Sequence, residues 1–238
     1  MTSLPLCCSA LDDSWPWRQP LPDLQLIALN FDTTALQDGD FLRCGIDAPP
    51  SVQRAVAKRK TEYLAGRLCA REALFRSLGI TACPGTGEDR APLWPRDCVG
   101  SITHSHGWAA AVVGRRTHYA GLGLDVEQIM PDARALKLAH QILTANEQDR
   151  FAGQMANTPG EFLTLAFSLK ESLFKALYPL TRQRFYFEHA ELVDTNPDGS
   201  SRLRLLTDLS TDWCSDRELD AHFTNRNGRV LSLVAVEA

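Results

Sequence analysis

Two acidic residues alternate with apolar ones in a short stretch, Gly123-Leu124-Asp125-Val126-Glu127. The stretch is typical of a β-strand, and because strand side chains alternate between faces, Asp125 and Glu127 point to the same side. Two carboxylates at this spacing can share a hard cation such as Mg²⁺, with phosphate oxygens and water completing its ligands. The same alternation is common on the solvated face of an antiparallel sheet. The pattern by itself leaves both interpretations open.

A second charged group, Phe167-Ser168-Leu169-Lys170-Glu171-Ser172-Leu173-Phe174-Lys175, follows about forty residues later. On a helix, Glu171 and Lys175 are four residues apart and therefore neighbours, and we expect Lys170 beside them. An ordinary surface ion pair at this spacing contributes about 0.3–0.5 kcal/mol and needs no function. The functional alternative makes Glu171 a third metal ligand or a general base, with Lys175 neutralising phosphate charge.

Hydroxyl and imidazole side chains gather in Gly100-Ser101-Ile102-Thr103-His104-Ser105, which we expect to form part of a turn between two strands. Such a turn suits a phosphate or ribose contact with His104 as donor. A zinc site built from Cys98, His104 and His106 has no recognised ligand spacing. A hydrolase nucleophile among these serines lacks the G-x-S-x-G motif.

Basic residues cluster on a predicted helix and a following loop, although the chain as a whole is acidic. Its 25 Lys and Arg against 29 Asp and Glu give a formal charge of −4. This balance argues against generic nucleic-acid binding, which needs a surplus of cations. A local anion site and a solvated helix face both fit the cluster. Its members are Lys58, Arg59, Lys60, Arg67, Arg71 and Arg90.

The elements that must position these residues form an α+β pattern with antiparallel sheets. One helix is expected to begin with Ser51 as N-cap and to end at Gly79. Another is expected from the capping-box spacing Thr158-Pro159-Gly160-Glu161 to Pro179. Predicted strands cover residues 24–31, 99–103, 108–113, 121–127, 191–193, 202–206 and 230–236.

Length and composition set the remaining limits. At 238 residues the chain suits two domains, and we place them at residues 1–118 and 119–238. No apolar stretch approaches the length of a membrane span, and no signal peptide is recognisable, so a cytoplasmic protein is expected. The seven cysteines include no C-x-x-C pair and are expected to be reduced thiols.

Five motifs, in this order, resemble the Sfp-type phosphopantetheinyl transferases, and among them the subgroup of the enterobactin synthase transferase component. The resemblance spans about residues 50–180. Leu124 replaces the usual Ile or Val, and Phe167 stands where many members carry Trp. The family motifs K-R-x-x-E-[YF]-L-A-G-R, R-x-P-L-W-P, G-S-I-[ST]-H, G-[IV]-D-[IVL]-E and [WF]-x-x-K-E-x-x-x-K correspond to Lys58–Arg67, Arg90–Pro95, Gly100–His104, Gly123–Glu127 and Phe167–Lys175.

The resemblance implies a pseudo-twofold pair of α/β subdomains with antiparallel sheets, and coenzyme A and Mg²⁺ bound between them. The N-terminal half would contact the coenzyme's phosphates, and the C-terminal half would carry the metal-binding carboxylates and the catalytic helix. Asp125, Glu127 and Glu171 would surround the metal, and Lys175 would lie near the pyrophosphate. The implied phosphate contacts are Arg90, Thr103 and His104, with Arg59 and Arg67 as further anchors.

The implied activity is transfer of 4′-phosphopantetheine from coenzyme A to a serine of an acyl or peptidyl carrier protein, releasing 3′,5′-ADP. Such carriers serve fatty-acid, polyketide or nonribosomal siderophore synthesis. Glu171 would act as base, directly or through a metal-bound water. We expect a monomer without nucleic-acid or membrane partners, whose carrier docks on some of Lys60, Arg71, Arg182 and Arg184. The alternatives are another Mg²⁺-dependent phosphoryl or nucleotidyl transferase and a non-catalytic coenzyme A- or carrier-binding module.

Overall fold

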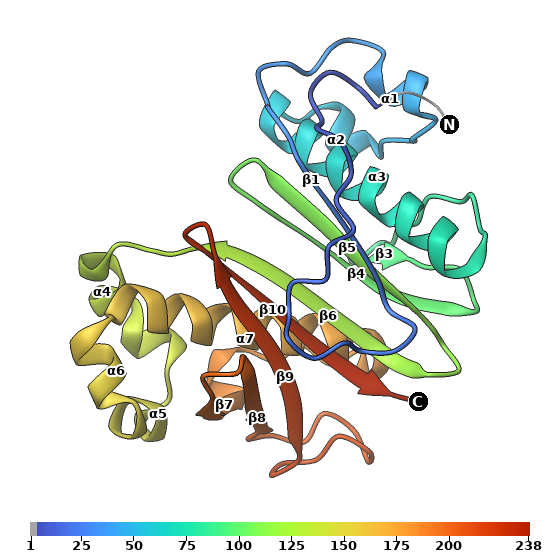
Figure 1. Ribbon diagram of the computed structural model, residues 1–238. Helices are drawn as coiled ribbons and strands as arrows, with labels where there is room; N and C mark the ends of the chain where they lie inside the picture. The colour runs from blue at the N-terminus through green and yellow to red at the C-terminus, as the bar shows by residue number, and fades with distance from the viewer. Residues whose placement is uncertain (1–3) are drawn as a thin grey trace. The chain divides into compact units, whose positions relative to one another are not determined.

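The computed structural model describes residues 4–238 and divides the chain into two compact units (Figure 1). The first unit comprises the chain up to Trp15 together with Leu21–Tyr119, and the second comprises Pro16–Pro20 together with Ala120–Ala238. The sequence placed residues 16–20 in the first half, whereas the structure groups them with the second. Both units combine helices with β-sheets, so the predicted α+β class is confirmed.

The first unit is built on a three-stranded antiparallel sheet in the order β1-β5-β4. These strands are β1 (Gln25–Asn30), β5 (Trp108–Arg115) and β4 (Cys98–Ser105). The long helix α3 (Ala57–Leu78) packs against all three strands, as Figure 1 shows. The smaller elements are α1 (Asp40–Cys44), α2 (Pro50–Gln53) and the short paired strands β2 (Gly85–Thr86) and β3 (Pro92–Leu93).

The single helix predicted from Ser51 to Gly79 is in fact two helices. Ser51 lies inside α2, whose N-cap is Pro49, and α3 begins only after Val56. Prolines at the start of α2 favour a new helix there because they fix φ near the helical value. The predicted end is correct, since Gly79 caps α3 with a φ of 72°, a conformation that glycine adopts without steric cost.

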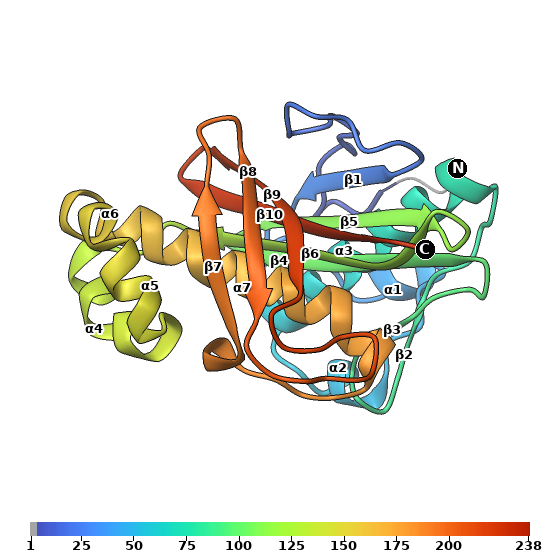
Figure 2. The ribbon, with the colours of Figure 1, turned by 90° about the horizontal axis from the view of Figure 1, so that it is seen from below.

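The second unit contains a five-stranded sheet in the order β6-β10-β9-β8-β7, covered on one face by helix α7 (Pro159–Thr181) (Figure 2). The pairs β10-β9, β9-β8 and β8-β7 are antiparallel. The strands are β6 (Tyr119–Gln128), β7 (Ala190–Thr195), β8 (Ser200–Leu205), β9 (Glu218–Arg226) and β10 (Arg229–Glu237). The remaining helices are α4 (Asp132–Ile142), α5 (Ala145–Arg150), α6 (Ala152–Asn157) and the 3₁₀ turn η1 (Phe187–His189).

Helix α7 lies against this sheet through leucines that repeat every fourth residue. Of these, Leu169, Leu173 and Leu177 are fully buried. Pro179 does not end the helix, because a proline in the last turn removes only one backbone hydrogen bond. The helix continues to Thr181, and Arg182 caps it in the left-handed region at φ 56°.

The capping box predicted at Thr158 does not form, because the Thr158 side chain makes no hydrogen bond to the start of α7. Its partner in the motif, Glu161, accepts a hydrogen bond from Asn225 instead. A capping box does form at the start of α5, between Thr144 and Glu147. The same residue spacing therefore gives a cap in one place and a tertiary contact in the other.

All seven cysteines are free thiols, and four of them are buried. Among residues 4–238, no helix is long and apolar enough to cross a membrane.

Candidate active site

Glycines bring helix α7 unusually close to strand β6. A Cβ atom on Gly123 would lie 1.8 Å from the carbonyl oxygen of Ser172, and one on Gly121 would lie 2.5 Å from that of Ala176. Because residues of a strand alternate in direction, Gly121 and Gly123 share a face with Asp125 and Glu127. The face of β6 that carries the two carboxylates is therefore the face that α7 approaches.

This approach joins the two charged motifs. The Lys175 Nζ on α7 donates to the Asp125 Oδ1 at 2.6 Å and to the Leu124 carbonyl oxygen at 3.1 Å. Asp125 is 4% exposed, so the ion pair is largely shielded from water on its acidic side. The spacing of each motif was predicted, but this contact across fifty residues was not.

The carboxylates also affect one another's ionisation. Burial, which is the largest cause, and the nearby Asp125 and Glu171 charges together raise the pKa of Glu127 to about 7, and Lys175 opposes this rise. Burial likewise raises the pKa of Glu171, with Lys175 opposing the rise and Asp125 adding to it. Asp125, Glu127 and Glu171 thus belong to one electrostatic cluster.

This cluster has the chemistry of a site for a hard cation. Its oxygen donors are the kind that Mg²⁺ prefers, and mutual repulsion of carboxylates is relieved when a divalent ion binds. Within residues 4–238, however, no group of three or more His, Cys, Asp or Glu side chains is arranged so that it could hold a metal ion. The donor types fit Mg²⁺, whereas the arrangement has the Lys175 ammonium against Asp125.

Lys170 lies apart from the pair beside which it was expected. It is 3% exposed, and its Nζ donates to Glu147 Oε2 at 2.7 Å and to the carbonyl oxygens of Ile142 and Phe187. The helix turns by about 100° per residue, so Lys170 and Glu171 leave α7 in different directions. The expectation that Lys170 is a neighbour of Lys175 was wrong.

A pocket of about 200 Å³ lies beside Glu171 within the second unit. Its lining includes Glu171, the buried Lys170 and the exposed Arg184. The rest is mainly aromatic and comes from the end of α7 and the segment leading to η1. These aromatic residues are Phe174, Phe185, Tyr186 and Phe187. The pocket thus offers an apolar wall next to a carboxylate.

The first unit has a different pocket, of about 380 Å³, lined largely by α3, β4 and the loop that carries β2 and β3. Three arginines line it, against one carboxylate, that of Glu62. The arginines are Arg59, Arg67 and Arg90. This excess of positive charge in a concave site is suited to an anion with several charges.

Arg67 is the most deeply placed of these arginines. It is 6% exposed, its Nη2 donates to the Gly85 carbonyl oxygen and the Thr86 hydroxyl at 3.1 Å, and its guanidinium lies 4.6 Å from the centre of the Tyr63 ring. Its Nε is buried and has no hydrogen-bond partner among the described residues. A buried guanidinium without a carboxylate in its hydrogen-bonding shell is stabilised when an anion binds.

His104 and Arg59 form the outer part of the same pocket. Arg59 Nη1 lies 3.0 Å from His104 Nε2, and the Glu62 carboxylate lies 3.8 Å from both side chains. The pair thus places an imidazole and a guanidinium within reach of one bound group. Arg90 completes the lining from a loop position with φ 69°.

The segment that carries His104 is not a turn. Thr103, His104 and Ser105 belong to β4, and only His106 and Gly107 connect β4 to β5. Strand alternation therefore places Thr103, which is buried, on the face opposite His104, and Thr103 is not part of the pocket lining. The predicted contact of Thr103 with a phosphate stays a prediction.

Sequence reasoning missed Tyr63 and Thr86, which hold Arg67 and line the pocket. The helical spacing could have revealed part of this lining. Residues 59, 62, 63, 66 and 67 follow the i, i+3, i+4, i+7, i+8 order of one helix face. Arg71 of the basic cluster, by contrast, is not part of this lining and donates to the Cys44 carbonyl oxygen.

These features define a class of protein: an α+β protein with an anion pocket in one unit and a cluster of carboxylates and lysine in the other. Residues 48–114 match the 4′-phosphopantetheinyl transferase N-terminal domain, and residues 121–234 match the 4′-phosphopantetheinyl transferase superfamily. The chain belongs to this superfamily, and the predicted assignment to its transferases is confirmed.

Individual relatives agree with the family match. Enterobactin synthase component D of Salmonella typhi is 33% identical over 91% of this chain and 88% of that protein. The 4′-phosphopantetheinyl transferase Svp of Streptomyces mobaraensis is 40% identical over 79% of this chain and 76% of its own. The 4′-phosphopantetheinyl transferase PptT of Mycobacterium tuberculosis is 34% identical over 78% and 86%, respectively.

Among solved structures, the holo-ACP-synthase of Plasmodium yoelii is similar over 51% of this chain and 96% of its own, at 13% identity and a TM-score of 0.38. The family membership rests on the sequence matches.

Proposed function

We propose that this chain transfers the 4′-phosphopantetheine group of coenzyme A to a serine of an acyl or peptidyl carrier protein and releases 3′,5′-ADP. The observation that carries this proposal is the 2.6 Å ion pair between Lys175 and Asp125. It joins the helical and the strand motif of a single transferase family into one charged cluster. That cluster supplies the groups that phosphoryl transfer requires, namely carboxylates for a cation and an ammonium for phosphate charge.

Asp125, Glu127 and Glu171 are the proposed ligands of Mg²⁺. The raised pKa values of Glu127 and Glu171 support this assignment: burial is the largest cause of both shifts, the Asp125 charge adds to both, and the Glu171 charge adds to that of Glu127. The ion, when bound, would stabilise the negative charge that builds on the phosphate oxygens.

Glu171 is the proposed base that removes the proton of the carrier serine, directly or through a water molecule. A pKa raised from the usual carboxylate range brings a base closer to neutral pH, where it accepts a proton more effectively. Lys175 is the proposed donor to the pyrophosphate, and its contact with Asp125 holds its ammonium in the cluster. The pocket beside Glu171 gives room for part of a substrate next to the base.

The anion pocket of the first unit is the proposed site for the phosphates of coenzyme A. Arg59, Arg67, Arg90 and His104 line it, and guanidinium groups bind phosphate oxygens with two parallel hydrogen bonds. The proposed division of labour therefore assigns coenzyme binding to residues 1–118 and the reaction to residues 119–238. For the carrier, the exposed residues Arg182 and Arg184 are the better docking candidates, because Arg71 is held by its bond to Cys44.

The test is to incubate the protein with coenzyme A, Mg²⁺ and a panel of apo-carriers from fatty-acid, polyketide and siderophore synthesis, and to measure carrier mass. We expect one carrier to gain the phosphopantetheine mass with release of 3′,5′-ADP, and EDTA to prevent it. Transfer from a nucleoside triphosphate would favour another Mg²⁺-dependent transferase instead. Coenzyme A binding without turnover would favour the non-catalytic module.

A further inference from the structure

One ion pair in the second unit is more deeply buried than any group of the proposed site. Glu147 on α5 is 0% exposed and Lys170 on α7 is 3% exposed, and their charged atoms lie 2.7 Å apart. Removing two charges from water costs several kcal/mol per ion, and apolar residues of the same volume are often equally stabilising. Packing energy alone therefore does not explain a charged pair at this position. The elements that the two side chains connect provide an explanation.

Both members of the pair use their hydrogen-bonding capacity on separate elements. The three donors of Lys170 go to Glu147, to the Ile142 carbonyl oxygen at the end of α4, and to the Phe187 carbonyl oxygen in η1. Glu147 accepts in addition from the backbone N–H groups of Leu192 in β7 and Thr144. Through these two side chains, α7 is bonded to α4, α5, η1 and β7.

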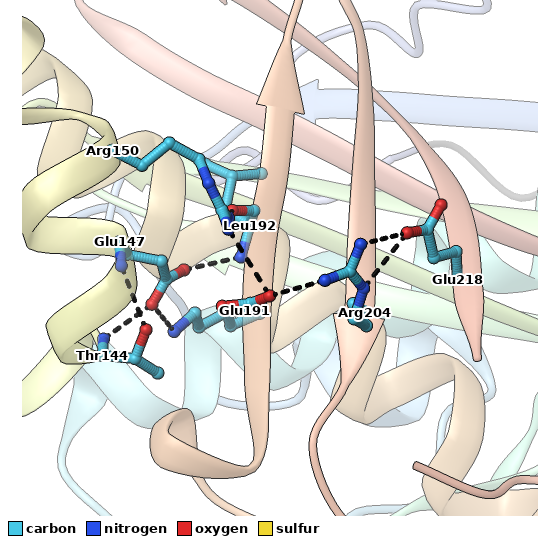
Figure 3. A network of polar contacts seen from close by, with 8 residues as sticks. Thr144, Glu147, Arg150, Glu191, Leu192, Arg204 and Glu218 are labelled. Carbon is cyan, nitrogen blue, oxygen red and sulfur yellow. Dashed lines mark hydrogen bonds and ion pairs between the residues drawn. The ribbon is translucent and has the colours of Figure 1, made fainter. Parts of the chain in front are cut away.

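The network extends outward from Glu147, as Figure 3 shows. Arg150 of α5 donates to the Leu192 carbonyl oxygen at 2.7 Å and approaches the buried Glu191. Arg204 of β8 then joins Glu191 to Glu218 at the exposed end. Helix α5 therefore contacts β7 through both Glu147 and Arg150, and these contacts fix the position of Glu147. The inner end of the network lies at α7, and the outer end lies in solvent.

The inner end borders the pocket beside the proposed base. Lys170 directly precedes Glu171 in α7, and both residues line that pocket. Phe187, whose carbonyl oxygen Lys170 holds, supplies part of the pocket's aromatic wall. A rotation of α7 about its axis would break the contacts of Lys170 and change the direction of Glu171 at the same time.

We infer that the buried Lys170–Glu147 pair is a positioning device for Glu171, which fixes the rotation of α7 and the adjoining pocket wall so that the carboxylate faces the serine of the carrier. This inference rests on the proposed function, since it takes Glu171 as the base. Lys170 and Glu147 are positioning residues and touch no reacting atom. Misplacement of a catalytic group by about 1 Å costs about a hundredfold in rate, so a small rotation suffices.

The test replaces the pair by neutral residues of similar volume, K170M together with E147Q, in the full chain. We expect a folded protein by circular dichroism whose kcat for carrier modification falls at least tenfold. Its KM for coenzyme A should stay within about twofold, because the arginine and histidine contacts proposed for the coenzyme's phosphates lie in the other unit. A purely structural role would lower the amount of folded protein and leave the kcat of the folded fraction unchanged.

The matched control is R204M, which cuts the same network at its exposed end and should keep kcat within about twofold. A folded K170M/E147Q protein with wild-type kcat, or an equal loss in R204M, would overturn the inference. If the double variant does not fold, E147D decides, because it keeps the buried charge and withdraws the carboxylate by one methylene. We then expect kcat to fall about threefold or more, and an unchanged kcat overturns the inference. Lack of transfer by the wild-type protein would instead refute the proposed function.

Discussion

Helices α3 and α7 are similar in construction and opposite in chemistry. They have 22 and 23 residues, each packs on an antiparallel sheet, and each ends at a residue in the left-handed region, Gly79 or Arg182. The polar stripe of α3 lines an open pocket with Arg59 and Arg67. The polar stripe of α7 instead carries Glu171 and Lys175 to a strand with further carboxylates.

This difference in charge underlies the proposed assignment of coenzyme binding to one unit and of the reaction to the other. On α3 the charges face a pocket of about 380 Å³, which leaves space for a multivalent anion. On α7, glycines in β6 remove the side chains that would keep helix and strand apart, so the acidic groups are buried close together, and burial first and mutual repulsion second raise their pKa values. Variants of α3 should therefore change coenzyme affinity, and variants of α7 should change turnover.

The largest effect is expected from Glu171→Gln. An amide cannot accept the serine proton, and a general base contributes about 10²–10⁴ to the rate. We therefore expect kcat to fall in this range, measured by the mass shift of a carrier protein, while the Kd for coenzyme A changes little. Full transfer by the variant would exclude Glu171 as the base and would remove the contrast between the helices.

The next effect is expected from Gly123→Ala, which tests the close approach of α7 to β6. The added Cβ would lie 1.8 Å from the Ser172 carbonyl oxygen, so backbone must move. We expect the free energy of unfolding to fall by roughly 3 kcal/mol in urea denaturation, with loss of transfer activity.

Gly153→Ala is the matched control, since its Cβ would meet no atom within 4 Å on helix α6. It should leave stability unchanged or raise it by less than about 1 kcal/mol. Equal stability of the two variants would show that the close packing of α7 on β6 does not require glycine at position 123.

A smaller effect is expected from Arg67→Met, which keeps the buried stem and removes the charge. The KM for coenzyme A should rise about tenfold, equivalent to about 1.4 kcal/mol, with kcat unchanged. Arg76→Met is the control on the same helix, because Arg76 pairs with Glu72 and Asp13 and does not line the pocket. A drop in kcat without a change in KM would contradict the role assigned to α3.

The smallest effect concerns the crowded carboxylates of the metal-free protein. Since burial raises the pKa of Glu127 from 4.5 to about 7, the folded state holds this proton more tightly than the unfolded chain. The stabilisation is complete below about pH 4.5 and is lost as the pH rises through about 7. The side chain is partly exposed, so solvent screening limits the loss to about 1 kcal/mol.

Urea denaturation in EDTA at pH 5 and pH 8 measures this loss. Wild-type protein should lose more stability between the two pH values than Glu127→Gln, and Mg²⁺ should reduce the difference. Parallel pH profiles for the two proteins would show that the pKa of Glu127 is not raised in the folded state.

The sequence by itself determined the features that depend on local periodicity. Strand alternation places Asp125 and Glu127 on one face, and helical spacing makes Glu171 and Lys175 neighbours, because both periods follow from backbone geometry alone. The order of the motifs was sufficient to identify the family. Most of the strands were also predicted. The exceptions are the two-residue strands β2 and β3 and strand β9, which lacks a clear alternating pattern over its exposed end.

Only the tertiary structure decided where the remaining charges lie. Lys170 is next to Glu171 in sequence, yet it is buried against Glu147. Arg67 belongs to the basic cluster, yet it is buried against the ring of Tyr63. Such contacts join residues far apart in the chain, and their energy depends on burial and on partners that no local pattern encodes. The 2.6 Å bond between Lys175 and Asp125 has the same origin: packing at Gly123 makes it possible.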